Sequence, residues 1–355
     1  MSPRMKFECH SNWSQLPASV DYLFEHSANV SMFSTREWFE TLYATTFEDG
    51  QSLLLTSVVD DDHVLALLPL VETENKNWQS FNHRYTALYS LLLAEEKQTE
   101  VLDCLVEGLN QLPIHSLQLS PVADDDSNLF NLQRVMESSG YESHRHFFFY
   151  NWIHRTQGQS FDEYMAGRPA QLRNTIARKR RKLGREHKYT IRLFLGDEVQ
   201  QGLNDYHTAY SASWKAYELY VALLHATAVN LSVPGWTRLA VLYIDGNPAA
   251  AQLWFVVHGK ASIFRLAYDE EWKRYSPGSI LTAYLMQYVI DTDRVEEIDF
   301  LTGNEAYKQD WMSERRQRWR LLFVKQHKPQ SGPGMLINRL KYIFKRIFNN
   351  GLTDN

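Results

Sequence analysis

Apolar and polar positions along the chain predict the same order of elements twice. In the first half, two β-branched and Leu-rich runs at residues 52–59 and 63–71 predict a pair of strands joined by the acidic turn 60–62. A third strand is predicted at 85–93, and a helix at 98–112 carries its apolar residues on one face. A short strand, a helix and an aromatic strand are predicted next, at residues 116–119, 129–136 and 145–153.

The second half repeats this plan. Strands are predicted at 237–244 and 249–257, and Asp245-Gly246 between two apolar runs is a strong hairpin signal. A third strand is predicted at 261–268. The remaining predicted elements are a helix from Ser276, as N-cap, and Pro277 to about residue 290, and strands at 297–300 and 318–324. A tandem duplication explains the repeated order.

A different kind of segment separates the halves. Residues 161–185 have a helical pattern, and residues 168–188 contain nine Lys or Arg against one Glu. A second helix is predicted at 198–217, with Trp214 on its buried side. The predicted division of the chain is an N-terminal domain at 1–155, a helical connecting segment at 156–230, a C-terminal domain at 231–330 that includes this segment, and a basic amphipathic tail at 331–355.

Composition excludes several classes of protein. The 355 residues are 44% apolar and 22% charged, which is ordinary globular usage, and the net charge of −5 does not favour a protein that coats DNA. Two cysteines exclude a disulfide scaffold, and none of the 13 histidines has metal-ligand spacing, so no metal is expected. No signal-peptide pattern or bilayer-length apolar run is present, so we expect a cytoplasmic protein.

The second half resembles a known family. The resemblance is carried by IDGNPAAAQLWFVVHGKASIFRLAYDEEWKRYSPGSILTAYLMQYV, by EEIDFLTGNEAYKQDW and, upstream, by FDEYMAGRPAQLRNTIARKRRKL and YSASWK. These segments resemble GNAT-superfamily acyltransferases, in the branch of the cellulose-biosynthesis acetyltransferase-like proteins and the Fem-type aminoacyltransferases. The resemblance extends over about residues 30–325. It implies an α/β (α+β) protein with two tandem GNAT-like domains, mixed and mostly antiparallel sheets flanked by helices, and acyl transfer to an amine.

A GNAT-type site needs two parallel strands that part, so that a thioester-bearing arm lies between them; here these would be 261–268 and 297–300. The helix that follows the first strand would bind pyrophosphate through its free N–H groups. The residues implied for the donor are Arg274, Ser276, Gly278, Ser279 and Lys308. The family's usual phosphate loop is absent, since a single glycine follows Arg274. An N-capped helix with proline at its first position is the alternative interpretation, without a ligand.

Three residues are candidates for the chemistry. Asp299, near the end of a buried strand, would act as general base or anchor the acceptor ammonium; alternatively it caps the turn 301–303. Tyr307 would protonate the leaving group, or pack edge-on. Asp269 is the second choice for a polar site residue.

Three further residues are candidates for substrate binding: Arg180, Lys215 and Tyr268. The basic run 178–182 is interpreted either as a solvated helix face or as a site for phosphate, carboxylate or tRNA. In the tail, residues 335–349 have the pattern of an interfacial helix, or of one docked on protein.

The resulting hypothesis is an N-acyltransferase that moves an acyl group from acyl-CoA, as co-substrate, to an amine or hydroxyl of a lipid- or sugar-linked cell-envelope or polysaccharide precursor. A peripheral position at the inner membrane face would follow from the tail. The alternatives are a Fem-like aminoacyltransferase using aminoacyl-tRNA, and a non-catalytic scaffold protein.

Overall fold

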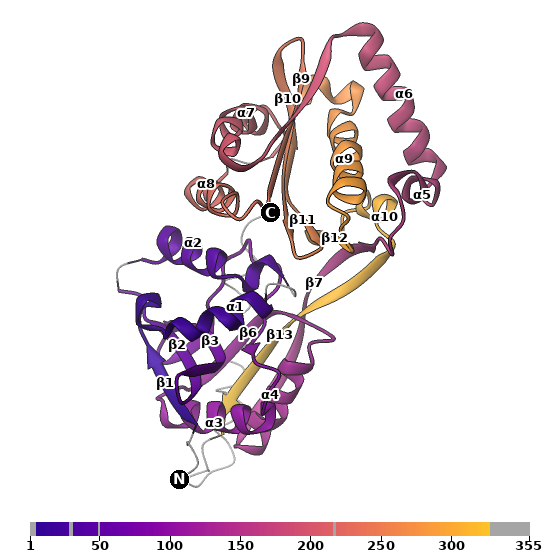
Figure 1. Ribbon diagram of the computed structural model, residues 1–355. Helices are drawn as coiled ribbons and strands as arrows, with labels where there is room; N and C mark the ends of the chain where they lie inside the picture. Colours follow the sequence, from indigo (N-terminus) through magenta and orange to yellow (C-terminus); the bar gives the residue numbers. More distant parts are fainter. Residues whose placement is uncertain (1–4, 28–30, 49, 216–217, 327–355) are drawn as a thin grey trace.

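The computed structural model describes residues 5–27, 31–48, 50–215 and 218–326 of the chain (Figure 1). The strands are β1 Lys6–His10, β2 Leu53–Asp60, β3 His63–Glu74, β4 Asn77–Ser80, β5 Leu92–Leu93, β6 Ser116–Ala123, β7 Tyr141–Arg155, β8 Tyr189–Phe194, β9 Thr237–Ile244, β10 Asn247–Val257, β11 Lys260–Tyr268, β12 Glu297–Thr302 and β13 Glu314–Lys325. The helices are α1 Asp21–Ser27, α2 Arg36–Thr46, α3 Gln98–Gln111, α4 Ser127–Ser138, α5 Phe161–Ala166, α6 Ala170–Glu186, α7 Val199–Ser211, α8 Val221–Asn230, α9 Pro277–Gln287 and α10 Lys308–Trp311. The predicted amphipathic tail lies outside the described residues.

All strands of the described chain belong to one sheet in the order β1-β2-β3-β4-β6-β13-β7-β12-β11-β10-β9-β8, with β5 paired to β3. Most neighbours are antiparallel, and the two parallel pairs are β4 with β6 and β11 with β12, one in each half. Helices flank both halves (Figure 1). The predicted class, two tandem α/β units with mixed and mostly antiparallel sheets, is confirmed.

The two halves exchange strands at their junction. The last strand, β13, pairs with β7 along its length and inserts its C-terminal part between β6 and β7 of the first half. In return, the end of β7 pairs with β12 of the second half. The long β7–β13 ribbon therefore connects the halves (Figure 1). The domain boundaries at residues 155, 230 and 330 stay predictions, and the sheet is continuous from the first half into the second.

The second-half sheet is buried on both faces. Along β9, Leu239 and Val241 face one apolar core, which continues into the first half, and Ala240 and Leu242 face the other. Such strands have near-continuous apolar sequences because neither face meets water. Figure 1 shows α7 and α8 on one side of these strands and α6 and α9 on the other. α2 of the first half packs against α8, so the halves share a core.

Several predicted elements differ from the structure. The third strand of the first half is Asn77–Ser80, and within residues 85–93 only Leu92–Leu93 is a strand. The helix predicted at 161–185 is broken at Pro169, which has no N–H to continue the hydrogen-bond ladder. Trp214 lies beyond the end of α7 and is 52% exposed, so its prediction as a core residue was wrong.

Candidate functional site

The parallel strands β11 and β12 part within the second half. Their register runs through only three pairs, Lys260 with Glu297, Ala261 with Ile298 and Ser262 with Asp299. β11 then continues to Tyr268 while it stays paired with β10 on its other side. From Ile263 onward, the β11 edge that faces β12 has no strand partner among the described residues. The parting that the sequence predicted at this place is present.

Side chains at and after the last pair bend β12 away from β11. Asp299 Oδ1 accepts a hydrogen bond from the Leu301 N–H at 2.6 Å, and Leu301 adopts φ 55°. The ammonium of Lys308, buried beneath the turn, donates to the carbonyls of Phe300 and Thr302. A residue in the left-handed conformation interrupts a strand, because the side chains that follow it no longer alternate between the two faces of the sheet. Asp299 and Lys308 therefore fix the bend that opens the gap.

Asp299 is committed to this structural role. Its second oxygen pairs with Arg316 at 2.8 Å, and Asn151 Nδ2 donates to Oδ1 at 2.5 Å. These contacts lie on a small neighbouring cavity, away from the gap. Both carboxylate oxygens of Asp299 are therefore occupied by donors of the protein itself. The structure thus gives Asp299 the capping role that the sequence left open, and does not bring it to the cavity that follows.

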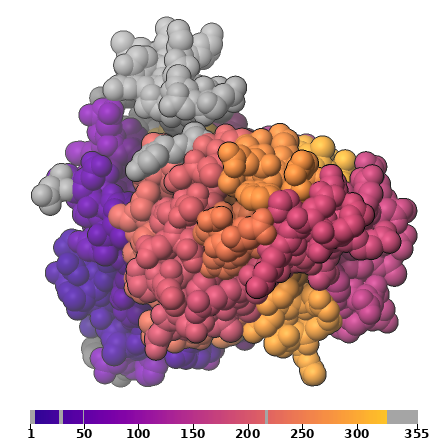
Figure 2. Space-filling view, turned by 90° about the horizontal axis from the view of Figure 1, so that it is seen from above, coloured from indigo at the N-terminus to yellow at the C-terminus, as the bar shows by residue number. Residues whose placement is uncertain are grey.

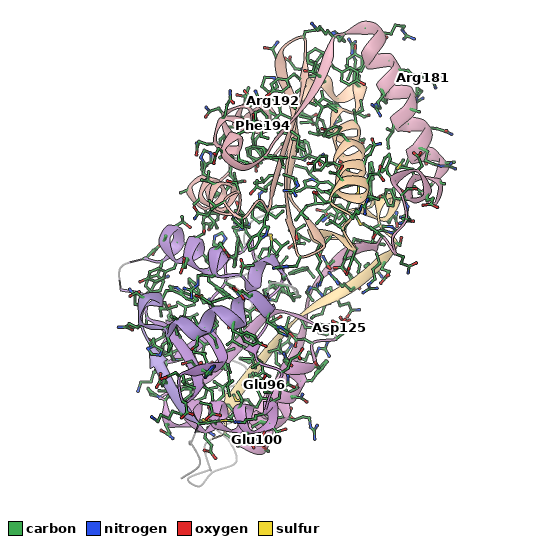
Figure 3. The ribbon with its side chains drawn as sticks, viewed as in Figure 1. Glu96, Glu100, Asp125, Arg181, Arg192 and Phe194 are labelled. Atoms are coloured by element: carbon green, nitrogen blue, oxygen red, sulfur yellow. The ribbon has the colours of Figure 1, made fainter. Side chains whose placement is uncertain are left out.

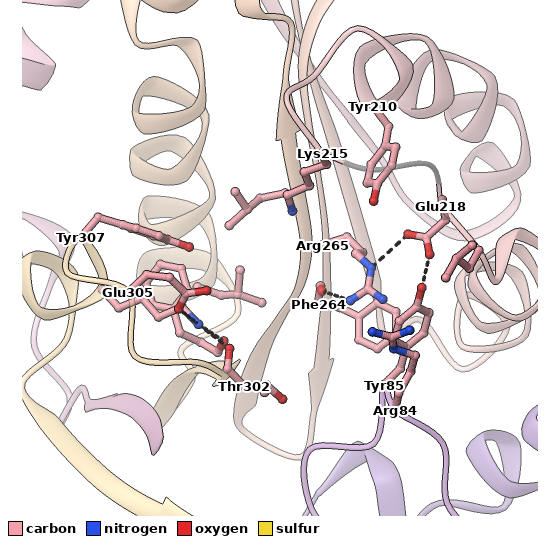
Figure 4. Close-up of a pocket in the computed structure, with 15 residues that line it drawn as sticks. Arg84, Tyr85, Tyr210, Lys215, Glu218, Phe264, Arg265, Thr302, Glu305 and Tyr307 are labelled. Atoms are coloured by element: carbon pink, nitrogen blue, oxygen red, sulfur yellow. Dashed lines mark hydrogen bonds and ion pairs between the residues drawn. The ribbon is translucent and has the colours of Figure 1, made fainter. Parts of the chain in front are cut away.

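A cavity of about 410 Å³ occupies the gap (Figure 4). Its walls come from the parted strands, from the loops after α7 and β12, and from the first half. The lining residues are Arg84, Tyr85, Tyr210, Lys215, Glu218, Leu219, Ile263, Phe264, Arg265, Leu266, Phe300, Thr302, Glu305, Tyr307 and Lys308. Of the residues predicted from the sequence, Lys215, Tyr307 and Lys308 are brought together here.

A buried ion pair forms one wall. Arg265 Nε lies 3.2 Å from Glu218 Oε2, and both side chains are largely buried. The Tyr85 hydroxyl of the first half donates to the same carboxylate, and the Arg265 guanidinium stacks 3.6 Å from the Tyr85 ring. Burial, followed by the hydrogen bond to Glu218, raises the pKa of Tyr85 to about 12. This cluster holds both halves against the cavity.

Sequence reasoning missed most of this wall. Arg84 and Tyr85 lie in a segment without a motif, and Glu218 lies three residues after the end of the quoted YSASWK. Arg265 stands inside an apolar strand, where a charged residue is rare unless it is paired. The charge of Arg265 within this apolar strand was the one feature of the sequence that could have indicated this wall.

Tyr307 lies on the opposite wall. Its ring packs edge-on against Phe300, with centroids 5.7 Å apart, and the side chain is 42% exposed. Burial, with a smaller contribution from the Glu305 carboxylate, raises the pKa of Tyr307. The hydroxyl therefore stays protonated across the physiological range and can donate a proton into the cavity. The edge-on packing and the predicted proton-donor role are compatible.

Lys215 points into the cavity from the loop after α7 (Figure 4). Burial, and next the nearby Arg265, lower the pKa of its ammonium to about 8. Its Nζ makes no hydrogen bond or ion pair with any residue that the structure describes. By contrast, Lys308 is paired with Glu305 at 2.9 Å.

The start of α9 lies beside the cavity and outside its lining. A Cβ placed on Gly278 would lie 3.1 Å from the Tyr268 ring, and the centre of the Trp214 ring lies 4.6 Å from the centre of the Tyr268 ring. Ser276 is the N-cap and Pro277 the first residue of α9, as predicted; Ser276 adopts a left-handed conformation, and its side chain accepts no capping hydrogen bond. Arg274 donates to the Tyr275 hydroxyl. The structure therefore packs Gly278 against Tyr268, and the predicted donor residues Arg274, Ser276, Gly278 and Ser279 lie outside the cavity lining.

The basic helix α6 runs along this region. Lys179 donates to the Arg274 carbonyl, and Lys182 lies 5.3 Å from the centre of the Tyr275 ring. In the space-filling view the α6 surface adjoins that of α9 (Figure 2). Arg180 is exposed, and Arg181 points to solvent (Figure 3). The predicted Arg180 does not line the cavity, and neither does Asp269, which caps the turn before α9 by accepting from the Glu271 N–H at 2.9 Å.

The equivalent gap in the first half is filled by the chain itself. β4 and β6 pair in parallel through Gln79 and Gln118 and then part. The segment that follows β4 enters the gap, where the Tyr89 N–H donates to the Pro121 carbonyl at 2.7 Å and the Tyr89 hydroxyl to Pro69 at 2.7 Å. Ser80 and Ser120 exchange two hydrogen bonds across it. No described segment of the chain fills the gap of the second half in this way.

Two kinds of feature are absent from the part of the chain that the structure describes. No group of three or more His, Cys, Asp or Glu side chains is arranged to hold a metal ion. No helix in the described part combines the length and the apolar composition needed to cross a bilayer.

Comparison with known proteins decides the fold family of the second half. Residues 170–309, from α6 to α10, match the family model described as acetyltransferase (GNAT) domain. These residues are similar to a GNAT acetyltransferase domain. The match includes both parted strands, α9 and Tyr307, so the gap described above lies within the region that is similar to this family.

Solved structures extend the fold likeness to nearly the whole chain. FemX has a TM-score of 0.64 at 11% identity, over 89% of this chain and 97% of that chain. The C-terminal domain of a putative lysylphosphatidylglycerol synthetase from Agrobacterium fabrum gives 0.55 at 13% identity, over 88% and 93% of the two chains. A tandem GNAT protein from the clavulanic acid biosynthesis pathway gives 0.50 at 12% identity, over 92% and 100%. No curated protein matches the sequence. These likenesses establish a tandem GNAT fold.

Proposed function

We propose that the protein is an N-acyltransferase that uses acyl-CoA as donor and an amine of a cell-envelope or polysaccharide precursor as acceptor, with the reaction in the second half. The observation that carries this proposal is the cavity at the parting of β11 and β12. An extended thioester arm adds to the free edge of β11 as a further strand would, through main-chain hydrogen bonds. Main-chain N–H groups of this edge polarise the acyl carbonyl.

The neighbouring residues supply the other roles. Tyr307 donates a proton to the leaving thiolate as the amine attacks the carbonyl and the C–S bond breaks, and the proton that the amine nitrogen loses restores the Tyr307 hydroxyl. The start of α9, with Arg274 and with Lys179 and Lys182 of α6, gives a cationic surface for the donor's phosphates. Asp299 enters the proposal as the residue that keeps the gap open, because its oxygens are already paired.

The first half serves as a support in this proposal. Its own gap is closed by the segment around Tyr89, and the same segment delivers Arg84 and Tyr85 to the cavity of the second half. One catalytic centre per chain is expected.

A transfer assay combined with thermal shift tests the proposal. Acetyl-CoA or a longer acyl-CoA is expected to raise Tm in proportion to ln[ligand], since a ligand of the native state stabilises it by mass action. Thr302→Trp fills the cavity from an exposed position and should abolish both the shift and the transfer. Thr190→Trp, a matched exposed threonine on edge strand β8, should retain both. A flat response to every acyl-CoA and to free CoA in the wild type contradicts an acyl-CoA donor and favours a scaffold.

The basic helix α6 favours an alternative donor, an aminoacyl-tRNA in place of acyl-CoA. Its exposed Arg178, Arg180 and Arg181 lie on one helix beside the start of α9, which is suited to a polyanion larger than CoA. An aminoacyl-tRNA donor predicts RNA association that weakens steeply between 50 and 200 mM salt, by roughly 10-fold or more. RNA association that is absent at both salt concentrations removes this alternative.

A further inference from the structure

The cavity contains more positive charge than its own residues neutralise. Six charged side chains line it, and two pairs among them are internally compensated: Arg265 with Glu218 at 3.2 Å and Lys308 with Glu305 at 2.9 Å. The two remaining side chains are cations, Arg84 and Lys215. Neither makes a hydrogen bond or an ion pair with any described residue. Two uncompensated positive charges therefore face the cavity.

These cations come from different halves of the protein. Arg84 belongs to the segment of the first half that also carries Tyr85, and its side chain is exposed at the cavity's edge. Lys215 extends into the cavity from the second half (Figure 4). A guanidinium binds an anionic oxygen group through two parallel hydrogen bonds, and an ammonium adds a point charge with three donors.

We propose that the acceptor carries an anionic oxygen group, a carboxylate or a phosphate, that binds between Arg84 and Lys215. This inference rests on the proposed function in placing the acceptor in this cavity. The acceptor is then an amine with an acid group in the same molecule. Neutral amines of the same shape leave both cations unneutralised in a partly desolvated site.

The groups around Lys215 are consistent with an ammonium that lacks a counterion. Burial contributes most to its lowered pKa of about 8, Arg265 and Lys308 lower it further, and Glu218 and Glu305 oppose them. The other titratable groups facing it on the cavity wall are Tyr85, Tyr210 and Tyr307, whose pKa values are raised above the ordinary range. An anion bound at Lys215 stabilises the ammonium and raises its pKa again.

Direct binding in the absence of donor tests the proposal. The probes are two matched pairs: N-acetyl-L-alanine against its carboxamide, and N-acetylglucosamine 6-phosphate against N-acetylglucosamine. In each pair only the charge-bearing group differs, and the two pairs separate a carboxylate from a phosphate. Isothermal calorimetry of the full chain is expected to show at least one acid binding about 10-fold or more tightly than its neutral partner.

The variants assign that preference to the two cations. Arg84→Gln and Lys215→Met should each reduce the acid's affinity by about 10-fold and leave the neutral partner's affinity unchanged. Arg134→Gln and Lys188→Met remove exposed charges of the same types elsewhere and should leave the preference intact.

The pH dependence separates a charge effect from loss of structure. In the wild type the acid's affinity should fall as pH rises from 7 to 9.5, because free Lys215 loses its proton through about pH 8. Lys215→Arg should keep the affinity and lose this pH dependence, since arginine stays charged.

Two results would overturn the anion site: equal affinity for acid and neutral probes in both pairs, including no detectable binding of any probe, or an acid preference that survives both charge-removing variants. If no acyl transfer is found and the acid preference still depends on Arg84 and Lys215, the proposed function fails and the anion site stands.

Discussion

Tyr307→Phe is expected to lower kcat for acyl transfer by about 10²- to 10⁴-fold, because it removes the proton donor for the leaving group. The KM for the donor should change little, since the phenyl ring retains its edge-on contact with Phe300. The unfolding free energy should also change little, because the side chain is 42% exposed. Steady-state kinetics and urea unfolding of the same preparation measure both quantities.

The pH profile provides a second readout for this residue. The pKa of Tyr307 is raised, so its hydroxyl keeps the proton that it donates until the pH exceeds that raised pKa. The wild-type rate should therefore show no alkaline fall from Tyr307 up to the ordinary tyrosine range near pH 10. Tyr22→Phe, on an exposed tyrosine of the first half, is the matched control. Wild-type kcat in Tyr307→Phe would exclude it as the proton donor.

Glu218→Leu is expected to reduce the unfolding free energy by about 3–5 kcal/mol, because it leaves the Arg265 guanidinium buried without a counterion. The Tyr85 hydroxyl also loses its acceptor, which weakens the contact between the halves. Urea unfolding with a fitted m-value measures the loss.

Two comparisons isolate the buried pair. The double variant Glu218→Leu with Arg265→Met should regain much of the stability, because an apolar pair of similar volume no longer carries an unpaired charge. Glu198→Leu removes the exposed partner of Arg192, at 3.6 Å, and should cost about 0–1 kcal/mol. A loss in Glu218→Leu no larger than that in Glu198→Leu would show that the pair does not hold the wall together.

The elements with strong periodicity were predictable from the sequence. β9 is observed at Thr237–Ile244, as predicted, because a strand buried on both faces has an uninterrupted apolar sequence. The helix α3 and the hairpin at Asp245-Gly246 follow equally local signals. The parting of β11 and β12 was predictable through the family resemblance, and its local cause, a left-handed Leu301, was not visible in the sequence.

The elements that depend on distant partners were not predictable. β13 inserts into the first half because both β6 and β7 present free edges there, and no local pattern records that pairing. Strand β8 was missed because it is an edge strand with polar residues at its exposed positions, Thr190 and Arg192. The segment before Tyr89 was predicted as a strand, yet it is held by isolated hydrogen bonds to Pro69 and Pro121.

The residues of the candidate site also fall into those that a local pattern reveals and those that depend on distant contacts. Lys215 was found in one short family motif and Tyr307 with Lys308 in another, and each motif is contiguous in the sequence. The sequence could not reveal that Asp299 would be neutralised by Arg316, because the two are 17 residues apart on different strands. Arg84 and Tyr85 reach the cavity only through the packing of one half against the other, which no local pattern encodes.

A crystal structure with a non-transferable thioether analogue of acyl-CoA tests most directly whether the gap between β11 and β12 is the donor site. We expect the pantetheine arm to lie along the free edge of β11 from Ile263 to Leu266, with the acyl group in the cavity near Tyr307. An arm bound elsewhere, with the gap closed or empty, would contradict the proposed mechanism.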